Sequence, residues 1–142
     1  MLVGLPGSGK TTFYRQRFAA THEHISKDLF PHARNRARRQ AELIDAALRA
    51  RRSVVVDNTN VSPAERAPIL AAARNAGARV IGYYFAVPIP ACIVRNRGRE
   101  GRQQVPNVAI FAAAKRLVPP VRPEGFDELY TVDSAGQVSP TA

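Results

Sequence analysis

The stretch GLPGSGKT at residues 4–11 matches the pattern G-x-x-x-x-G-K-[ST], which is typical of a loop that wraps nucleotide phosphates. Glycines let the backbone curl so that its N–H groups face an anion, and the following helix adds the positive end of its dipole. Lys10 is expected to reach the β- and γ-phosphates, and the Thr11 hydroxyl to contact Mg²⁺. The alternative is a purely structural glycine turn. The pattern predicts nucleotide contacts from Gly4, Pro6, Gly7, Ser8, Gly9, Lys10, Thr11 and Thr12.

Around this loop, strand-like and helix-like segments alternate. Residues 53–57, SVVVD, form a β-branched run of the kind buried on both faces of a parallel sheet. Ser62, Pro63 and Glu65 form a capping box that begins a helix ending near Gly77. Strands are expected at 1–3, 22–26, 53–57, 78–86 and 127–132, and helices at 10–20, within 34–52, and at 62–77, 88–97 and 107–118. The alternation predicts one α/β domain over residues 1–142, with a parallel sheet, helices on both faces and a frayed polar tail at about 134–142.

The charge of the chain is high and unevenly distributed. There are 21 basic residues against 11 acidic ones, a net charge of +10. Residues 32–52 hold seven arginines against two acidic residues, a net of +5, and residues 91–105 hold four arginines against one glutamate, a net of +3. Such clusters suit a polyanionic partner such as nucleic acid. Arginine use in a high-GC genome and a solvated helix face are the alternatives.

Other features narrow the class of protein. No apolar run approaches the ~18 residues of a membrane span, and no signal peptide is visible. Cys92 is the single cysteine, so neither an internal disulfide nor a cysteine-based zinc site is available, and a reducing cytoplasm is the expected compartment. His22 and His24 alternate along a strand, and nothing near them in the sequence resembles a metal site.

Two acidic residues follow predicted strands, where ligands of open α/β sheets collect. Asp57 ends the buried run, the place where a metal-supporting aspartate sits beside a phosphate loop; an ordinary turn residue is the alternative. Asp28 lies just past the second strand, where a carboxylate can accept the proton of a hydroxyl that receives a phosphoryl group. Without that role, Asp28 would be a helix N-cap. The side chains of Asn58, Thr59 and Asn60 either bind the acceptor or shape the turn.

The segment RNRGREGRQQVP at residues 95–106 is predicted to be part of a lid spanning about 90–106. Its glycines, at 98 and 101, provide hinges, and its arginines, at 95, 97, 99 and 102, provide forks for an anion. A transferring phosphoryl group develops charge that such arginines stabilise. A solvated basic loop is the alternative. Asn107 is expected to cap the helix that follows the lid.

The chain resembles the P-loop kinase domain of polynucleotide 5′-hydroxyl kinases, the end-healing enzymes of nucleic-acid repair. The resemblance rests on GLPGSGKTT, the aspartate of SKD, VVVDNTNVSPAER, RNRGREGRQQVP and PEGFDELY, which fall in the family's order and spacing. It implies that Asp28 is the general base, that Lys10 and Thr11 hold ATP and Mg²⁺, and that Arg95 and Arg99 clasp the phosphates. It also implies a three-layer α/β/α sandwich with a five-stranded sheet in the order 2-3-1-4-5 and a helical, arginine-bearing lid.

Two departures concern the acceptor side. Lys27 stands where the family usually has an arginine before its base, and Pro31 stands where an arginine often contacts the acceptor phosphate. Arg34 or Arg36 is a candidate substitute for that arginine.

The expected activity is transfer of the γ-phosphate of ATP, with Mg²⁺, to a 5′-hydroxyl of DNA or RNA, with Asp57 and Thr11 supporting the metal. The acceptor is expected near Asp28, residues 58–60 and Arg34, and a separate phosphatase or ligase is a possible partner. Alternatives are a kinase of a small-molecule hydroxyl and an NTP-dependent nucleic-acid-binding module that transfers nothing. The central strand begins at the first residue, so either the chain is a catalytic minimum or its natural start lies upstream.

Overall fold

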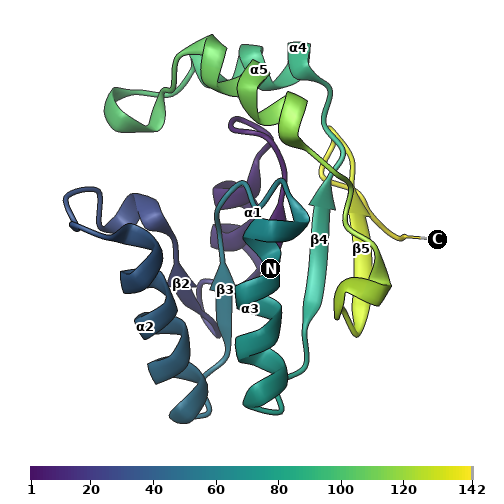
Figure 1. Ribbon diagram of the computed structural model, residues 1–142. Coiled ribbons are helices and arrows are strands. Elements are labelled where there is room, and N and C mark those ends of the chain that lie inside the picture. Colours follow the sequence, from purple (N-terminus) through teal and green to yellow (C-terminus); the bar gives the residue numbers. More distant parts are fainter. Residues whose placement is uncertain (142) are drawn as a thin grey trace.

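The computed structural model describes residues 1–141, apart from the side chain of Arg102, and Figure 1 shows how its elements are arranged. The strands are β1 Leu2–Val3, β2 Glu23–Ile25, β3 Val54–Val56, β4 Ile81–Phe85, β5 Glu128–Val132 and β6 Val138–Pro140. The α-helices are α1 Lys10–Arg17, α2 Arg36–Arg49, α3 Pro63–Asn75, α4 Ile89–Arg97 and α5 Asn107–Arg116. Short 3₁₀ turns are η1 Lys27–Leu29, η2 Gly101–Gln103 and η3 Arg122–Glu124. No helix in this described part is long and apolar enough to cross a membrane.

The strands form two hydrogen-bonded groups. β2 pairs in parallel with β3, and β1, β4, β5 and β6 form the second group in that order. A single parallel bridge between Leu2 and Asp57 joins the groups, because β1 is only two residues long. Across both groups the parallel strands follow the expected order 2-3-1-4-5, and β6 adds an antiparallel edge. The mainly parallel α/β fold is confirmed, while the single five-stranded sheet is corrected by this break and by the sixth strand.

Helices cover both faces of the sheet, as neighbouring side chains of β3 show. Val55 packs in a core with Phe13 of α1, while Val56 packs with Ile44 of α2 and Ile69 of α3. The central strands are therefore buried on both sides, which explains the uninterrupted β-branched run in the sequence.

The predicted lid corresponds to α4 and the loop after it, and together with α5 it lies across the carboxyl ends of the strands (Figure 1). Cys92 of α4 and Ile110 of α5 are fully buried in the same core as α1. The prediction that Asn107 caps α5 is wrong: Pro106, which is extended, is the N-cap, and Asn107 is the first helical residue. The lid is thus a packed helical layer above the glycine loop.

The polar tail was expected to be frayed, and this expectation is wrong for residues 138–140. The strand β6 pairs with β5, and the Asp133 carboxylate accepts hydrogen bonds from the N–H groups of Ala135 and Gln137 in the connecting turn. This strand covers the edge of β5, which would otherwise present unpaired backbone groups. Residue 142, the last of the predicted tail, lies outside the described residues.

Candidate active site

The loop between β1 and α1 requires glycine at two positions. Gly7 has a φ of +80°, and a Cβ there would lie 2.6 Å from the carbonyl oxygen of Cys92 in α4. Gly9 has a φ of +97° and is the N-cap of α1, without any side-chain cap. The N–H groups at the start of α1 are therefore not occupied by a capping side chain, which is the arrangement that binds anions at helix N-termini.

The Lys10 side chain folds back over this loop. Its ammonium donates to the carbonyl oxygens of Leu5, at 2.8 Å, and Gly4, at 3.0 Å, and the residue is buried. Burial lowers the pKa of Lys10 to about 8, and the nearby Asp57 carboxylate only partly opposes this effect. The ammonium is a poorly hydrated cation at the mouth of the loop, which favours contact with an anion.

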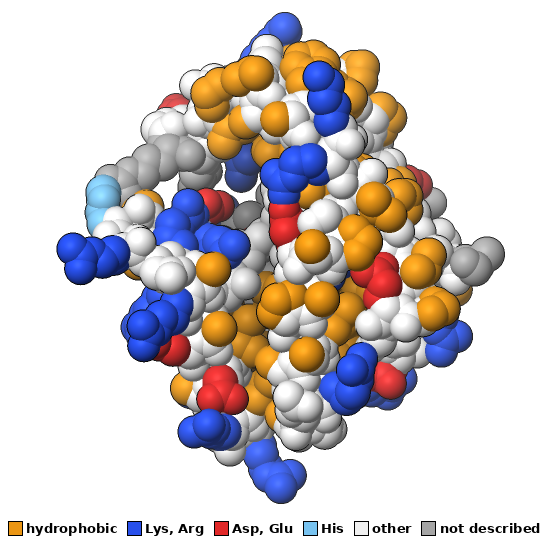
Figure 2. Space-filling view, viewed as in Figure 1, with side chains coloured by type: hydrophobic (Ala, Val, Ile, Leu, Met, Phe, Trp, Pro, Cys, Tyr) orange, Lys and Arg blue, Asp and Glu red, His pale blue; other side chains and the backbone are white. Residues whose placement is uncertain are grey.

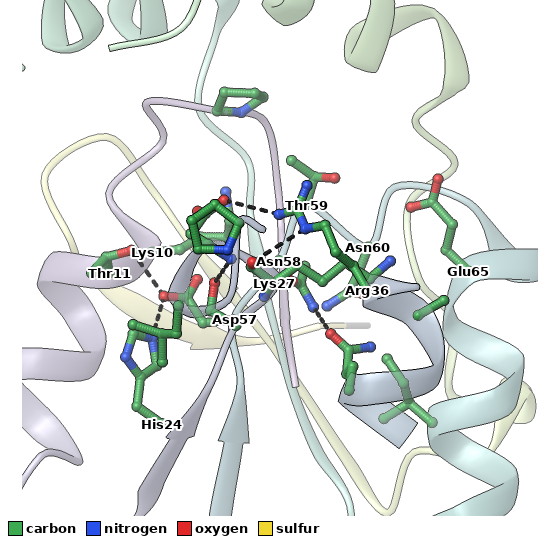
Figure 3. Close-up of a pocket in the computed structure, with 18 of the residues that line it drawn as sticks. Lys10, Thr11, His24, Lys27, Arg36, Asp57, Asn58, Thr59, Asn60 and Glu65 are labelled. Carbon is green, nitrogen blue, oxygen red and sulfur yellow. Dashed lines mark hydrogen bonds and ion pairs between the residues drawn. The ribbon is translucent and has the colours of Figure 1, made fainter. Parts of the chain in front are cut away.

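The Asp57 carboxylate lies at the centre of a small hydrogen-bond network (Figure 3). Its Oδ2 accepts from the Thr11 hydroxyl at 2.8 Å and lies 2.8 Å from His24 Nε2. The side chain is only 4% exposed, and burial alone would favour the neutral acid. The hydrogen bonds from His24 and Thr11 and the charge of Lys10 outweigh burial and hold the pKa of Asp57 below its usual value. An ionised carboxylate thus stands beside the threonine of the loop.

Asp28 lies in η1, just after β2. Its side chain is 94% exposed, and its Oδ1 lies 3.6 Å from the guanidinium of Arg36. Asp28 is not a helix N-cap, because Ser26 caps η1 and Asn35 caps α2. The Asp28 carboxylate therefore caps no helix, and its one ion-pair contact, with Arg36, is made through Oδ1.

The polar residues after β3 shape their own loop. Asn58 accepts from the Lys27 N–H at 2.9 Å and donates to Gln40 of α2 at 2.5 Å (Figure 3). Asn60 has a φ of +47°, is buried, and donates to the Leu2 carbonyl at 2.8 Å. Both asparagines act as turn-formers here, and they tie the loop to η1 on one side and to β1 on the other.

A buried ion pair joins two of the sequence segments on which the resemblance rests, VSPAER and PEGFDE. Arg66 of α3 is completely buried; its guanidinium donates to both carboxylate oxygens of Glu124, at 2.9 and 3.2 Å, and to the Asn60 carbonyl. The arginine of VSPAER and the glutamate of PEGFDE thus meet beneath the loop after β3. Ser62 caps α3 as predicted, while Glu65 accepts from the Val61 N–H rather than from that of the cap.

The two lid arginines singled out by the sequence differ in position. Arg99 lines the cleft and lowers the pKa of Lys10 by repulsion, secondary to burial. Arg95 does not line the cleft: its guanidinium donates to the Ser8 carbonyl at 2.7 Å and to the Ser134 carbonyl at 2.5 Å. Asn96 is buried and exchanges two hydrogen bonds with the Val105 backbone, which fastens the loop between α4 and α5. Arg102, another predicted lid cation, has a side chain outside the described part.

The glycine loop, η1, the loop after β3 and Arg99 line one cleft of about 1150 Å³. Figure 2 shows it as a hollow that continues between α2 and α3, where apolar side chains gather. An ion pair between Glu65 of α3 and Arg116 of α5 forms part of the cleft wall. The predicted residues that line it are Pro6, Gly7, Gly9, Lys10, Thr11, Thr12, Asp28, Asp57, Asn58, Thr59, Asn60 and Arg99. Gly4 and Ser8 are buried behind the loop, and Arg34 is exposed outside the cleft.

Comparison with known proteins agrees with this geometry. The family model AAA_33, described as an AAA domain, matches residues 1–120. The chain belongs to the AAA domain family. This AAA domain is similar to Chaetomium thermophilum Kti12 in complex with ADP-AlF3, at 18% identity and a TM-score of 0.68, over 93% of this chain and 87% of that chain.

Two kinase structures give similar matches to the AAA domain. A sugar kinase from Janibacter sp. has 19% identity and a TM-score of 0.69, over 96% of this chain and 84% of that chain. A putative kinase from Chloroflexus aurantiacus has 16% identity and a TM-score of 0.70, over 94% and 82%. The fold of the AAA domain is thus the kinase-like P-loop fold.

Sequence reasoning missed three polar contributors to the cleft of this AAA domain. His24 was set aside as a strand histidine, although its partner Asp57 lies one strand away. Gln40 sits on the inner face of α2, and Glu65 was read only as a helix cap. The alternation of His22 and His24 on β2 was the one available signal, and it did not say which strand lay beside them.

Proposed function

We propose that this chain is an ATP- and Mg²⁺-dependent kinase that phosphorylates the 5′-hydroxyl end of DNA or RNA. The observation that carries the proposal is the pairing of two features in one cleft. The glycine loop with its buried Lys10 supplies a site for phosphates, and the exposed Asp28 carboxylate supplies a proton acceptor. A phosphoryl donor and a hydroxyl acceptor would therefore meet between them.

On the donor side, Lys10 and the N–H groups at the start of α1 would bind the β- and γ-phosphates of ATP. Thr11 and Asp57 would hold Mg²⁺: both offer the oxygen ligands that this ion prefers, and Asp57 is an ionised carboxylate with little access to water. With few protein ligands, Mg²⁺ would take its remaining ligands from phosphate oxygens and water. Such an ion neutralises charge on the transferring phosphate.

On the acceptor side, the hydroxyl oxygen would attack the γ-phosphorus in line with the leaving ADP oxygen. The new O–P bond forms as the bond to the bridging oxygen breaks, and the hydroxyl proton passes to the Asp28 carboxylate. Arg99, which lines the cleft, would stabilise the charge on the phosphoryl oxygens. Arg95 would act differently from the original prediction, by holding the loop through the Ser8 carbonyl.

Arg36 is the proposed substitute for the arginine that the sequence lacks at position 31. It lines the cleft, lies 3.6 Å from Asp28 and is steadied by the Lys27 carbonyl at 3.2 Å. Arg34 lies outside the cleft. Arg36 would therefore contact the first phosphate of a 5′-hydroxyl strand while Asp28 faces the hydroxyl.

The proposal is tested by following transfer from γ-labelled ATP to 5′-hydroxyl DNA and RNA oligonucleotides, nucleosides and small alcohols. The variant Asp28→Asn should lower the transfer rate by ~10²–10⁴-fold, since it removes the proton acceptor. Its affinity for ADP should stay near that of the parent. The matched control is Asp45→Asn, an exposed carboxylate on α2 paired with Arg49 away from the cleft. Full transfer by Asp28→Asn would remove the base assignment, and transfer to no oligonucleotide would remove the proposed acceptor.

A second candidate is a kinase of a compact, partly apolar alcohol. It is favoured by the extension of the cleft between α2 and α3, which is lined by small apolar side chains including Ala37, Ala41, Ala64 and Pro68. Preferential phosphorylation of a small alcohol in the same panel would support this candidate. If the chain is instead a binding module that hydrolyses NTP without an acceptor, no oligonucleotide, nucleoside or alcohol in the panel would become labelled.

A further inference from the structure

His24 is held in place from two sides. Its ring stacks on that of Tyr14, with centroids 4.1 Å apart and planes 15° from parallel. The Tyr14 hydroxyl donates to the His22 carbonyl at 2.6 Å, which fixes the stacking partner in turn. The pairing of β2 with β3 brings His24 beside Val55, and the Asp57 N–H donates to the Ile25 carbonyl at 2.8 Å. The imidazole is therefore fixed to face one group, the Asp57 carboxylate (Figure 3).

We infer that His24 is a positioning residue that sets the Asp57 carboxylate for the metal ion. Both His24 Nε2 and the Thr11 hydroxyl lie 2.8 Å from the same oxygen, Oδ2. An ionised carboxylate only accepts hydrogen bonds, so Nε2 carries the proton in this contact. With Oδ2 held by two donors, the side chain cannot rotate freely, and Oδ1 is left to face the metal ion or its bound water.

The inference rests on the proposed function, because it assumes that Thr11 and Asp57 hold Mg²⁺ with the nucleotide. Groups that hydrogen-bond to a metal ligand commonly set its orientation, and their loss typically weakens metal binding by about 10–100-fold. His24 is half-buried and lines the cleft, but its Nε2 is already engaged with Asp57. Its predicted effect is therefore on metal affinity and not on the affinity of the loop for metal-free nucleotide.

Two substitutions separate the hydrogen bond from the packing. His24→Phe keeps an aromatic ring on Tyr14 and removes the donor to Asp57. His24→Gln gives up the stacking but places an amide N–H near the position of Nε2. The matched control is His22→Phe on the same strand, since His22 contacts Thr21 and Phe18 rather than Asp57.

The experiment titrates Mg²⁺ into each protein with a fluorescent ADP analogue, and separately measures the analogue's affinity in EDTA. His24→Phe should raise the apparent Kd for Mg²⁺ by at least about tenfold and leave the affinity in EDTA unchanged. His24→Gln and His22→Phe should resemble the parent protein more closely than His24→Phe does. This pattern supports a positioning role.

Two results would overturn it. One is an unchanged Kd for Mg²⁺ in His24→Phe; the other is an equal loss of affinity with and without Mg²⁺, which indicates general damage to the loop. If the parent protein binds the analogue with no dependence on Mg²⁺, the donor site of the proposed function fails and the inference falls with it. If it depends on Mg²⁺ and His24→Phe does not differ, only the inference fails.

Discussion

At the scale of single residues, the protonation of Lys10 should control nucleotide binding. Burial lowers its pKa to about 8, from an ordinary value of 10.5, so the free protein loses this charge as the pH rises through about 8. A bound phosphate favours the charged ammonium and raises the pKa again. At a pH between the pKa of Lys10 in the free protein and its pKa in the complex, ADP binding must take up a proton. In that range the affinity for ADP should fall with increasing pH.

Isothermal titration in buffers of different ionisation enthalpy measures this proton uptake. Uptake should be near zero at about pH 7, where the free ammonium is mostly charged, and should grow toward one proton above about pH 8. An ADP affinity that stays constant across this range, with no proton uptake, would contradict the assignment.

Some residues of the site could be predicted from the sequence, and others could not. The glycines, Lys10 and Thr11 are predictable because the chemistry of phosphate binding fixes both residue type and spacing. The sequence does not separate Arg34 from Arg36 as partner of Asp28; in the structure Arg34 precedes the Asn35 cap of α2, and Arg36, the first helical residue, contacts Asp28. His24 depends on the register between β2 and β3, which no local pattern encodes.

At the scale of elements, the Arg66–Glu124 pair should hold α3 to the segment before β5. Arg66→Met leaves a partly buried carboxylate without its partner and frees the Asn60 carbonyl, so it should cost about 3 kcal/mol of unfolding free energy. Arg66→Met with Glu124→Met should be less destabilised than Arg66→Met alone, because no unpaired charge remains. Urea unfolding of the parent, of Arg66→Met, of Glu124→Met and of the double variant measures this. Additive losses in the double variant would show that the two side chains act independently.

The hydrogen bonds of Asn96 should order the lid loop. Asn96 closes the loop between α4 and α5 through both backbone groups of Val105, and this loop carries Arg99. Asn96→Leu should therefore slow phosphoryl transfer and increase hydrogen exchange at residues 97–105. Asn107→Ala, an exposed change at the start of α5, is the control and should alter neither. Unchanged exchange in Asn96→Leu would show that packing of the lid helices alone orders the loop.

Sequence patterns identified the elements with strong periodicity and missed one without it. The β-branched run of β3 and the capped α3 were predictable, because burial and capping act through neighbouring residues. β6 has only three residues, Val138–Pro140, too few for a periodic pattern, and it pairs with the edge of β5. The single bridge between Leu2 of β1 and Asp57, which follows β3, likewise depends on strand length rather than on residue type.

For the whole molecule, the distribution of charge bears on whether a proposed polymeric acceptor could bind along α2. The net charge is +10, but much of the positive charge on the outer face of α2 is paired locally. Arg38 and Arg39 both contact Glu42, and Arg49 contacts Asp45. Exposed pairs of this kind contribute little to stability and can rearrange around phosphates. Arg36, which lines the cleft, would then be the main contact with a strand.

The last prediction concerns salt. If the protein contacts four phosphates of a single strand, its affinity for that strand should fall about 50-fold between 50 and 200 mM salt, because binding releases the counterions of those phosphates. The test is the KM for a 5′-hydroxyl oligonucleotide over this range, set against the KM for ATP as an internal reference. Arg36→Gln should weaken oligonucleotide binding and make the salt slope shallower, since one phosphate contact is lost. Arg49→Gln, at the far end of α2, should change the slope little. An acceptor KM no more salt-dependent than that for ATP would favour the small alcohol, because a neutral acceptor releases no counterions.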